Sequence, residues 1–526
     1  MGVNIYESPI KPVVDLEDGV TVYVPGYAYY GPEEPTLCTT ESEFEGLFGT
    51  KPYIFEEDQE PVGGPKIAKG SPEKGYLYAK SLLASGLQVL FHRFKGNTAD
   101  TAEAEFNLAF NGETYPIVIK ATSFGKSYSG IKVKLVKNEG NLYDITITDP
   151  DGNTTYTGTI SFDPASSIYF KTTDFGLVEF VSKNGAGEYI DIEDTKLAEI
   201  IKSSYNLTGL TSGEAILEVS DTAEAEFNLA SMYTSLATAG AEGMMYPLTD
   251  FERYPSVTYI TSGGYYIDKS AAGNLMSMAE KIKAIALIDL NLGVTVKDQT
   301  TWKTAQSALA GITGSTLAKG KAATFIGCNS FDLSPYRIVL GDSFNYLKCL
   351  GENMKKGIAA WIPVANDPNG VSPLGYDTTN KISTELSETM GEGKIGVSAN
   401  PLIYSTSAGG YKIMGNRTLL SNDGVLSPNS FLNVSVVVNR VERACRQTAN
   451  KLKIVSTNPV DTFIKFKNSV AKTIEPMVVQ QDGIKSYKIR HLPKTKPATI
   501  DIEIALVVVE GIETFNIYIP YSIALD

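Results

Sequence analysis

Three short segments have the glycine spacing of phosphate-binding loops. The run Gly391–Gly396 reads GEGKIG and matches G-x-G-x-x-G. That motif binds a pyrophosphate only where a strand leads into it and a helix N-terminus receives the ligand. Here a polar stretch precedes the run, and the segment VSANP (397–401) that follows it is not a helix start. We therefore predict a loop without a ligand.

The other two segments lack residues that a P-loop needs. Gly125-Lys126-Ser127 has Lys120 where the first glycine belongs, and a strand pattern follows it in place of a helix. Gly320-Lys321 has Ser315 in place of the upstream glycine and Ala322 in place of the hydroxyl. Without the glycine-lined nest of amide groups neither segment can hold a phosphate, so we predict no cofactor.

Metal binding and nucleophilic catalysis also find little support. The segment 149–153, DPDGN, hints at a calcium loop, but its glycine comes too early and Ile160 stands where the ligating glutamate belongs. A hairpin turn is the better interpretation. The two histidines, His92 and His491, have no neighbouring cysteine or serine motif. We predict no catalytic residue and no metal ligand, although a pair of carboxylates far apart in the chain, as in glycosidases, stays open.

Composition indicates a globular protein. The chain has 526 residues, 43% of them hydrophobic and 20% charged, which suits about three or four domains. Its longest apolar runs, such as 358–365, are too short to cross a bilayer, and the start MGVNIYESPI has neither a signal-peptide nor a myristoylation pattern. The four cysteines are isolated from one another in the sequence: Cys38, Cys328, Cys349 and Cys445. Isolated cysteines fit a reducing compartment, so we expect a soluble protein assembled in cytoplasm.

Charge is distributed unevenly along the chain. Its net charge is −14, yet residues 1–60 hold thirteen acids against two bases, and residues 440–500 hold thirteen bases against four acids. Two solvated faces would explain this, but blocks of opposite sign near the two ends also suit pairing between subunits or a basic face on an acidic partner. Nucleic acid is the weaker explanation because the whole chain is acidic and the basic block has few aromatic residues.

The first hundred residues predict strands and helices in alternation. An apolar strand over 20–30 runs into the turn Gly31-Pro32, and a short helix follows, with a capping box of Thr40 and Glu43 and a C-cap at Gly49. A second helix stops at Gly86, and a strand over 87–94 comes next.

A ten-residue repeat brackets a segment of different character. The sequence DTAEAEFNLA occurs at 100–109 and again at 221–230. Between the copies, alternating strands are predicted at 115–119, 131–136, 143–148 and 156–162. We interpret 96–230 as a small β-rich domain inserted into a host fold.

The remainder of the chain predicts an α/β layer followed by an α+β domain. Strands at 257–261, 283–290, 323–328 and 357–364 alternate with helices at 274–281, 301–310 and 342–353, which indicates a largely parallel sheet. Farther on we expect a strand over 431–438, a helix over 439–453 and a second helix from Pro459 to about Glu475. The apolar face of that last helix is expected to be Val460, Phe463, Ile464, Val470 and Ile474. Strands at 486–490 and 500–509 close the domain.

Several of these motifs together resemble those of contractile tail sheath proteins. They are the strand that ends in Gly31-Pro32, the helix that ends in Phe48-Gly49, the run WIPVANDPNG…PLG (361–375) and Gly415-Asn416-Arg417-Thr418-Leu419. Sheath proteins form the outer sleeve of contractile phage tails, tailocins and related injection machines. The resemblance covers 1–95 and about 250–526.

The resemblance implies a fold, partners and a mechanical function. The fold would have an N-terminal exchange arm (1–20), a central α/β sheath domain (21–95 and 231–410), the inserted outer domain (96–230), a C-terminal α+β inner domain (411–510) and a C-terminal arm (511–526). Subunits would form six-fold rings stacked helically around a tail tube, with baseplate and tail terminator proteins as further partners, and would contract to drive the tube through the host envelope. Neither nucleic acid nor membrane insertion is expected, and the location would be the virion tail.

Two sets of residues would carry that function. Extended terminal arms with β-forming residues suit strand addition to a neighbour; they contain Val3, Ile5, Tyr6, Ile517, Tyr518 and Ile519. Basic residues of the inner domain would face an acidic tube or pair with the acidic segment 1–60, and the sequence does not choose between these. They are Arg440, Arg443, Arg446, Lys465 and Lys472.

Other functions remain open at this stage. The sheath could belong to a phage tail, a tailocin, a type VI secretion system or another contractile injection system. An α/β enzyme, such as a cell-wall hydrolase, is the alternative from a different class, and it predicts a pocket with perturbed titratable groups within 250–410.

Overall fold

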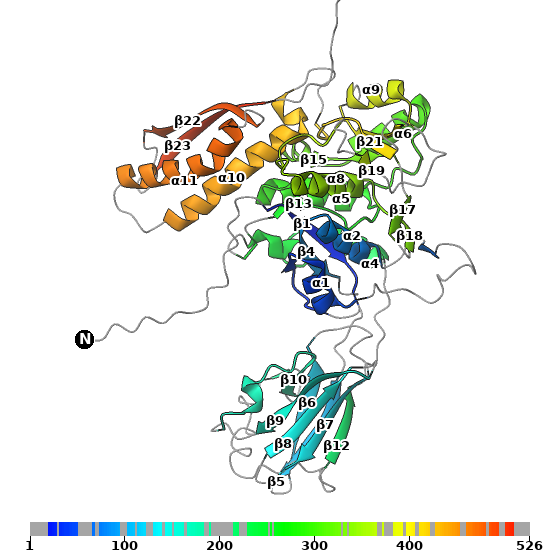
Figure 1. Cartoon of the computed structure of the whole chain (residues 1–526), viewed down its shortest axis with the longest axis vertical. Helices are drawn as coiled ribbons and strands as arrows, with labels where there is room; N and C mark the ends of the chain where they lie inside the picture. Colours follow the sequence, from blue (N-terminus) through cyan, green and yellow to red (C-terminus); the bar gives the residue numbers. More distant parts are fainter. Residues whose placement is uncertain are drawn as a thin grey trace, which may run out of the picture.

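The computed structural model of the chain combines helices with several separate sheets in a multidomain fold (Figure 1). It describes residues 19–28, 31–50, 66–68, 73–94, 103–110, 113–122, 130–138, 142–149, 152–161, 166–183, 189–190, 214–219, 229–250, 253–254, 257–327, 330–333, 336–365, 371–372, 382–392, 396–405, 410–420, 427–452, 459–479, 483–493 and 500–509.

A six-stranded sheet forms the centre of the molecule, in the order β15-β14-β13-β1-β4-β2. β1 pairs in parallel with β13 and β4, whereas the edge strand β2 runs antiparallel to β4. The sheet is therefore largely parallel, as the alternation of strands and helices predicted. Its strands are β1 (Thr21–Gly26), β2 (Thr36–Cys38), β4 (Gln88–Arg93), β13 (Val257–Ile260), β14 (Ile285–Leu287) and β15 (Ala322–Ala323).

Each face of this sheet contributes to a separate hydrophobic core. Successive side chains of a strand point to opposite faces, so Val22 and Val24 of β1 enter one core and Tyr23 enters the other. The helices that pack into the first core are α1 (Glu41–Phe48), α2 (Glu73–Ala84), α8 (Ser343–Lys355), α10 (Leu432–Leu452) and α11 (Pro459–Val479). Those of the second are α4 (Leu229–Ala237), α5 (Lys269–Ile282), α6 (Gln299–Ala310), α7 (Thr316–Lys319) and α9 (Thr384–Glu392).

Local signals fix the ends of the first two helices. At the start of α1 the Glu43 amide donates to Thr40 Oγ1 at 3.1 Å, and the Glu43 carboxylate accepts from the Thr39 amide at 2.8 Å. The predicted cap at Thr40 is confirmed, although the carboxylate reaches one residue farther back than a capping box requires. Gly49 and Gly86 follow α1 and α2 with φ of 96° and 88°, a conformation that favours glycine.

Two predicted strands of the central region take a different form. The predicted strand 323–328 divides at Thr324, because its hydroxyl donates to the Ile288 carbonyl at 2.7 Å while its own carbonyl accepts from the Asn400 amide at 3.0 Å. β15 thus joins the central sheet and β16 (Phe325–Ile326) joins another. The strand predicted at 357–364 is wrong, since that segment is irregular. Trp361 and Val364 are buried there without a strand ladder, and burial alone gives the same apolar pattern.

Two smaller sheets lie beside the central one. The first has the order β16-β20-β21-β19 and the second the order β17-β18-β3. β20 and β21 form one antiparallel hairpin, so the domain boundary predicted at 411 falls inside it. Their strands are β3 (Lys66–Ala68), β17 (Ser330–Leu333), β18 (Tyr336–Val339), β19 (Val371–Ser372), β20 (Asn400–Ser405) and β21 (Gly410–Ile413).

The insert forms two antiparallel four-stranded sheets, β11-β10-β6-β5 and β12-β7-β8-β9, at one end of the molecule (Figure 1). Its buried side chains, among them Val133, Ile145 and Phe170, belong to neither core of the central sheet. The Asn153 amide donates to Asp149 Oδ1 at 2.7 Å, which confirms the hairpin turn predicted there. The strands are β5 (Glu103–Phe110), β6 (Glu113–Ala121), β7 (Ile131–Lys137), β8 (Leu142–Thr148), β9 (Thr154–Ser161), β10 (Val178–Lys183), β11 (Tyr189–Ile190) and β12 (Glu214–Val219).

The two copies of the decapeptide do not share one conformation. Leu108 and Ala109 of the first copy lie in β5, whereas the equivalent Leu229 and Ala230 begin helix α4. Residues 221–228 of the second copy lie outside the described residues. Since the sequences are identical, the surroundings decide the conformation of this pair.

Deleting residues 100–220, which leaves one decapeptide copy directly before α4, is expected to preserve the fold of the remaining chain. β12, the last strand of the insert, lies against β5 and β6 at its beginning, so the chain enters and leaves the insert at neighbouring points. Thermal unfolding should show the transition of the central domain at an unchanged temperature. By electron microscopy, any tubes formed by the full chain should still form, and their loss would make the insert part of the lattice.

Candidate assembly interface

Helix α10 (Leu432–Leu452) begins the C-terminal unit, and it replaces the strand predicted at 431–438. The prediction was wrong because the first turns of α10 are buried all round: Leu432, Val434 and Val437 face different directions, and none is exposed. A helix without a polar face has no 3.6-residue pattern, and its valines favour a strand by propensity alone.

Helix α11 (Pro459–Val479) extends four residues beyond its predicted end and turns a different face inward. Val470 and Ile474 are buried as predicted, together with Phe466 and Met477. Val460 and Ile464, also predicted to face inward, are 62% and 48% exposed, and that part of the prediction is wrong. The inward face differs from the predicted one because the core contacts of α11 continue to Met477, beyond Glu475, where the helix was predicted to end.

A two-stranded antiparallel sheet packs on α11 and completes the unit. Its strands are β22 (Ile484–Leu492), which is longer than the predicted 486–490, and β23 (Asp501–Val508), which is one residue shorter at each end than the predicted 500–509. The inner face contacts α11, where the rings of His491 and Phe463 lie 5.4 Å apart. On the outer face Arg490 and Glu503 form an ion pair at 2.5 Å. Within the described part of the chain no third strand pairs with either β22 or β23, so both edges of the sheet are open.

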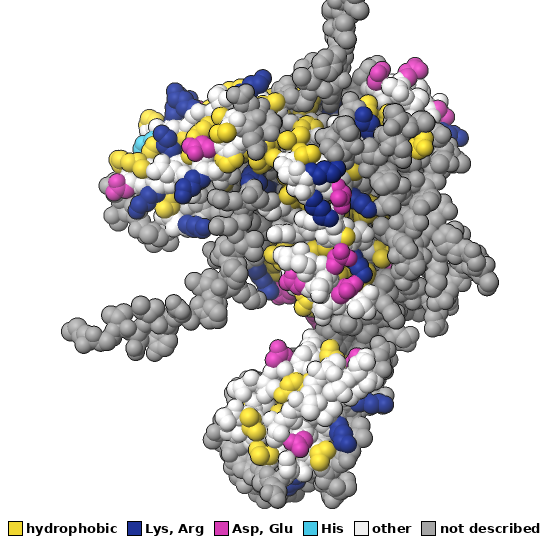
Figure 2. All heavy atoms as spheres, in the orientation of Figure 1, with side chains coloured by type: hydrophobic (Ala, Val, Ile, Leu, Met, Phe, Trp, Pro, Cys, Tyr) yellow, Lys and Arg dark blue, Asp and Glu magenta, His cyan; other side chains and the backbone are white. Residues whose placement is uncertain are grey.

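Exposed apolar side chains concentrate on this same unit. Of the nine large hydrophobic side chains that are exposed among the described residues, five lie on α11 and the β22–β23 sheet. Figure 2 shows hydrophobic and basic side chains next to one another over this part of the molecule. Exposed apolar groups close together mark interaction surfaces more often than chance positions do. The five are Val460, Ile464, Val479, Leu492 and Val507.

The five basic residues predicted to face a tube fall into two groups. Lys465 and Lys472 are exposed on the outer side of α11. The three arginines lie on α10 and point toward the rest of the chain: Arg440 stacks on the Trp361 ring at 5.3 Å, and Arg446 donates to the Lys281 carbonyl at 3.2 Å. The structure therefore does not bring the five onto one surface.

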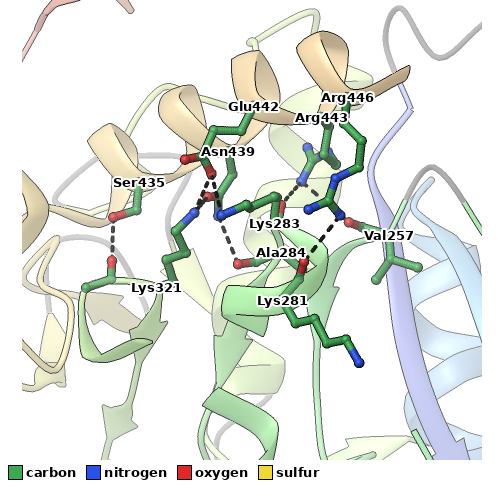
Figure 3. A network of polar contacts seen from close by, with 11 residues as sticks. Val257, Lys281, Lys283, Ala284, Lys321, Ser435, Asn439, Glu442, Arg443 and Arg446 are labelled. Carbon is green, nitrogen blue, oxygen red and sulfur yellow. Dashed lines mark hydrogen bonds and ion pairs between the residues drawn. The ribbon is translucent and has the colours of Figure 1, made fainter. Parts of the chain in front are cut away.

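Arg443 has the most enclosed position of the three arginines. It donates to the Lys283 carbonyl at 2.8 Å and to the Val257 carbonyl at 3.4 Å (Figure 3). Burial, and next the neighbouring charge of Arg440, lower the pKa of Arg443 to about 10. Together with Arg446 it binds carbonyls at the C-terminal end of α5, where the helix dipole favours a cation. The hydrogen bonds of these two arginines connect α10 to the central domain.

The rest of that contact is a polar network along one side of α10 (Figure 3). Ser435 donates to the Gly320 carbonyl at 2.6 Å, and Asn439 Nδ2 donates to the Ala284 carbonyl at 2.8 Å. The Lys321 ammonium lies 2.6 Å from Asn439 Oδ1 and 2.5 Å from Glu442 Oε2. Because these partners precede β14 and β15, and Val257 begins β13, α10 lies across the amino ends of three parallel strands. No spacing in the sequence indicated this network, since Lys321 and Asn439 are 118 positions apart.

The opposite edge of the central sheet, where open α/β sheets bind ligands, is filled by side chains of the protein itself. Asp289, after β14, accepts from the Ser343 amide at 3.0 Å and from Ser343 Oγ at 2.5 Å. Tyr78 hydrogen-bonds the same hydroxyl at 3.0 Å. At the end of β1, a Cβ on Gly75 would meet the Gly26 Cα at 2.4 Å, so α2 and β1 are in backbone contact.

Two carboxyl groups at this edge have raised pKa values. Burial raises the pKa of Asp289 to about 6, and burial followed by the Asp289 charge raises that of Asp342 well above its usual range. Perturbed groups within 250–410 were expected of an enzyme, but these two are 2% and 4% exposed and are packed against α8. Asp289 accepts hydrogen bonds from the first residue of α8, and Asp342 directly precedes that helix without a side-chain cap.

A pocket among the described residues lies elsewhere, next to the end of β4. It has a volume of about 270 Å³ and is lined by the end of β4, residues 241–247 and Glu33. One lining residue, His92, forms a hydrogen bond of 2.8 Å between its Nδ1 atom and the Tyr23 hydroxyl. Burial lowers the pKa of His92 to about 4.

Because His92 is buried, we predict that the free energy of unfolding decreases in acid. Because its pKa falls from 6.5 to about 4 on folding, only the unfolded chain binds a proton between these values. The stability that neutral His92 contributes is present above pH 6.5 and is lost as the pH falls to 4, by about 3 kcal/mol. We expect the stability difference between wild type and His92→Asn, measured by thermal unfolding, to shrink over this range.

The second histidine provides a matched control. His491 is exposed on β22, so His491→Asn should leave the pH dependence of the melting temperature as in the wild type. A His92→Asn curve that runs parallel to the wild-type curve would contradict a buried neutral His92.

The remaining predicted motifs and residues can be placed briefly. Gly391 belongs to the end of α9, a helix and not the strand that a dinucleotide motif needs, and Gly320 follows α7. Gly125-Lys126-Ser127 and all six arm residues (Val3, Ile5, Tyr6, Ile517, Tyr518 and Ile519) lie outside the described residues. Among the residues that are described, no three His, Cys, Asp or Glu side chains are grouped to hold a metal ion. None of the helices described here is both long and apolar enough to span a bilayer.

Comparison with known proteins gives a weak structural likeness. No family model and no curated protein matches the chain. Among solved structures it is similar to a chain of the six-fold symmetrised cryo-EM structure of the anti-feeding prophage baseplate, with a TM-score of 0.38 and 13% identity over 57% of this chain and 83% of that one. A TM-score at this level carries no argument, so the proposal below rests on the residues of this chain.

Proposed function

We propose that this chain is a subunit of the contractile sheath of a phage tail, a tailocin or another contractile injection system, and that its function is mechanical. Copies would polymerise helically in stacked six-fold rings around a tail tube and contract to drive the tube through an envelope. Baseplate and terminator proteins would bind the two ends of the sheath, and the site of action would be the tail of the particle. The proposal assigns the chain no catalytic role, no cofactor and no nucleic acid.

The observation that carries this proposal is the two-stranded sheet to whose edges no other strand of the described residues pairs. A two-stranded sheet is marginally stable alone, and its unpaired amide and carbonyl groups invite further strands. Here β22 and β23 offer such edges beside exposed Val507 and Leu492. Terminal arms rich in β-forming residues, such as Ile517-Tyr518-Ile519, are suited to fill them from neighbouring subunits.

Charge on the same unit suits a reversible contact with the tube. Lys465 and Lys472 are exposed on α11, and contacts between exposed charges are weak, screened by salt and easily exchanged. Such contacts can be released during contraction more readily than an apolar seam. The three arginines of α10 already bind groups of the central domain, so we now assign tube contact first to the two lysines.

The filled carboxyl edge of the central sheet supports a structural role over an enzymatic one. Its buried Asp289 accepts hydrogen bonds from the start of α8, and α2 contacts β1 directly. A domain built this way can rotate and slide as a rigid body while exchanged terminal arms keep neighbours connected.

Electron microscopy of the purified full-length chain tests the proposal. We expect long striated tubes, free in solution or around a tube protein. Dispersed particles over a wide range of protein and salt concentrations would contradict it.

A further inference from the structure

Three side chains between the central and C-terminal domains have the arrangement that a lysine–asparagine cross-link requires. They are Lys321, directly before β15, and Asn439 and Glu442 of α10. We propose that Lys321 and Asn439 form an isopeptide bond within the chain, with Glu442 as the catalytic residue that moves the protons. This modification site is independent of the proposed function.

The distances place the amine against both groups with which it must react. Lys321 Nζ lies 2.6 Å from Asn439 Oδ1 and 2.5 Å from Glu442 Oε2 (Figure 3). Asn439 Nδ2 donates to the Ala284 carbonyl at 2.8 Å, which fixes the plane of the amide. Nζ is thus held next to the oxygen of the amide whose carbon it must reach, and holding two reacting groups side by side supplies part of the rate of such a reaction.

Burial favours the reactive form of the amine. The Lys321 side chain is 5% exposed and Asn439 is 1% exposed. Burial lowers the pKa of Lys321, and the hydrogen bond and charge of Glu442 act in the opposite direction. A carboxylate next to a buried ammonium can take its proton, which leaves the neutral amine that attacks.

The reaction balances without any other reactant. Glu442 accepts a proton from Lys321 Nζ, whose lone pair then attacks Asn439 Cγ after Nζ moves from the amide oxygen to the face of the carbonyl carbon. The tetrahedral intermediate collapses as the Cγ–Nδ2 bond breaks. Nδ2 leaves as ammonia with the proton that Glu442 returns. Glu442 then takes the second proton that Nζ still carries, so a neutral Nζ–Cγ amide remains.

Glu442 has a second lysine nearby that serves as an internal control. Lys283 Nζ lies 3.7 Å from Glu442 Oε2, and no described contact joins it to the Asn439 side chain. Loss of Lys283 should therefore leave the bond intact, whereas loss of Lys321 should prevent it.

Intact mass measurement of the folded, full-length protein after prolonged incubation is the test. We expect the wild type and Lys283→Met to be lighter than their sequences by one ammonia, and a protease digest to contain one branched peptide with Lys321 and Asn439. Lys321→Met, Asn439→Ala and Glu442→Gln should each have the full sequence mass. Asn439→Asp should lose water in place of ammonia if it reacts, because its leaving group is a hydroxyl.

The result that overturns the proposal is a wild-type mass equal to that of the sequence with no branched peptide in the digest. Ammonia loss that persists in Glu442→Gln would overturn the role of Glu442 alone. An unmodified mass counts in support only where circular dichroism shows that the variant is folded, because an unfolded chain could not form the bond in any case.

Discussion

Removal of residues 515–526 is expected to give a folded, monomeric protein that forms no tubes. The described strands, both cores and the β22–β23 sheet all end by Val509, so the deletion removes none of the described residues. If it adds a strand to a neighbour's open edge, its removal takes away the backbone hydrogen bonds that hold subunits together. Size-exclusion chromatography and electron microscopy should show the monomer, and thermal unfolding an unchanged transition.

A matched pair of substitutions separates strand formation from mere chain length. Replacing Ile517, Tyr518 and Ile519 by Val, Phe and Val keeps three strand-forming residues, and this variant should polymerise. Replacing the same three by glycine keeps the length but removes strand propensity, and assembly should be lost. An insoluble truncated chain, or one with a collapsed melting transition, would mean that the segment packs in its own subunit, which would contradict strand exchange.

The parts of the fold that could be predicted from sequence are those fixed by neighbouring residues. Thr40 and Gly49 bound α1 because a cap needs only a hydroxyl three residues from an amide and a glycine in the left-handed region. The Asp149–Asn153 turn forms for a similar reason. In each case the energy that decides the conformation comes from atoms within a few residues.

The errors arise where distant residues decide. The segment 431–438 forms a helix because the central sheet and α11 enclose it, and no local pattern records this enclosure. Arg443 looked like a surface charge, yet its partners are the carbonyls of Val257 and Lys283, 186 and 160 positions away.

The same limit explains why the sequence does not reveal the cluster of Lys321, Asn439 and Glu442. In the sequence Lys321 belongs to an incomplete phosphate motif, and Glu442 is one acid within a basic block. The fold brings them together by laying α10 across the amino ends of β13, β14 and β15. Sequence separation of this size hides a site unless the pairing of strands is already known.

Reversing the charge of α11 should abolish assembly on tail tubes without unfolding the subunit. Lys465 and Lys472 are exposed, so Lys465→Glu with Lys472→Glu should leave the melting temperature within about 2 °C of wild type, as is usual for surface changes. An acidic tube would then repel the helix. Tube-free polymers should still form, because the strand-exchange edges are unchanged, and co-sedimentation with the tube protein should fall to background. Lys303→Glu, an equally exposed change on α6, is the control and should assemble normally.

Reversing an arginine of α10 should have a different and larger effect on the subunit itself. Arg443→Glu would place a carboxylate against the carbonyls of Lys283 and Val257, where a half-buried cation now donates two hydrogen bonds. Each carbonyl left unpaired costs about 1–3 kcal/mol, and the carboxylate would repel both, so this variant should unfold at a lower temperature. If instead Arg443→Glu stays fully stable and fails only on tubes, the arginine faces the tube. If the α11 reversal removes tube-free polymers as well, the two lysines contact neighbouring sheath subunits, and the basic surface belongs to the lattice and not to the tube.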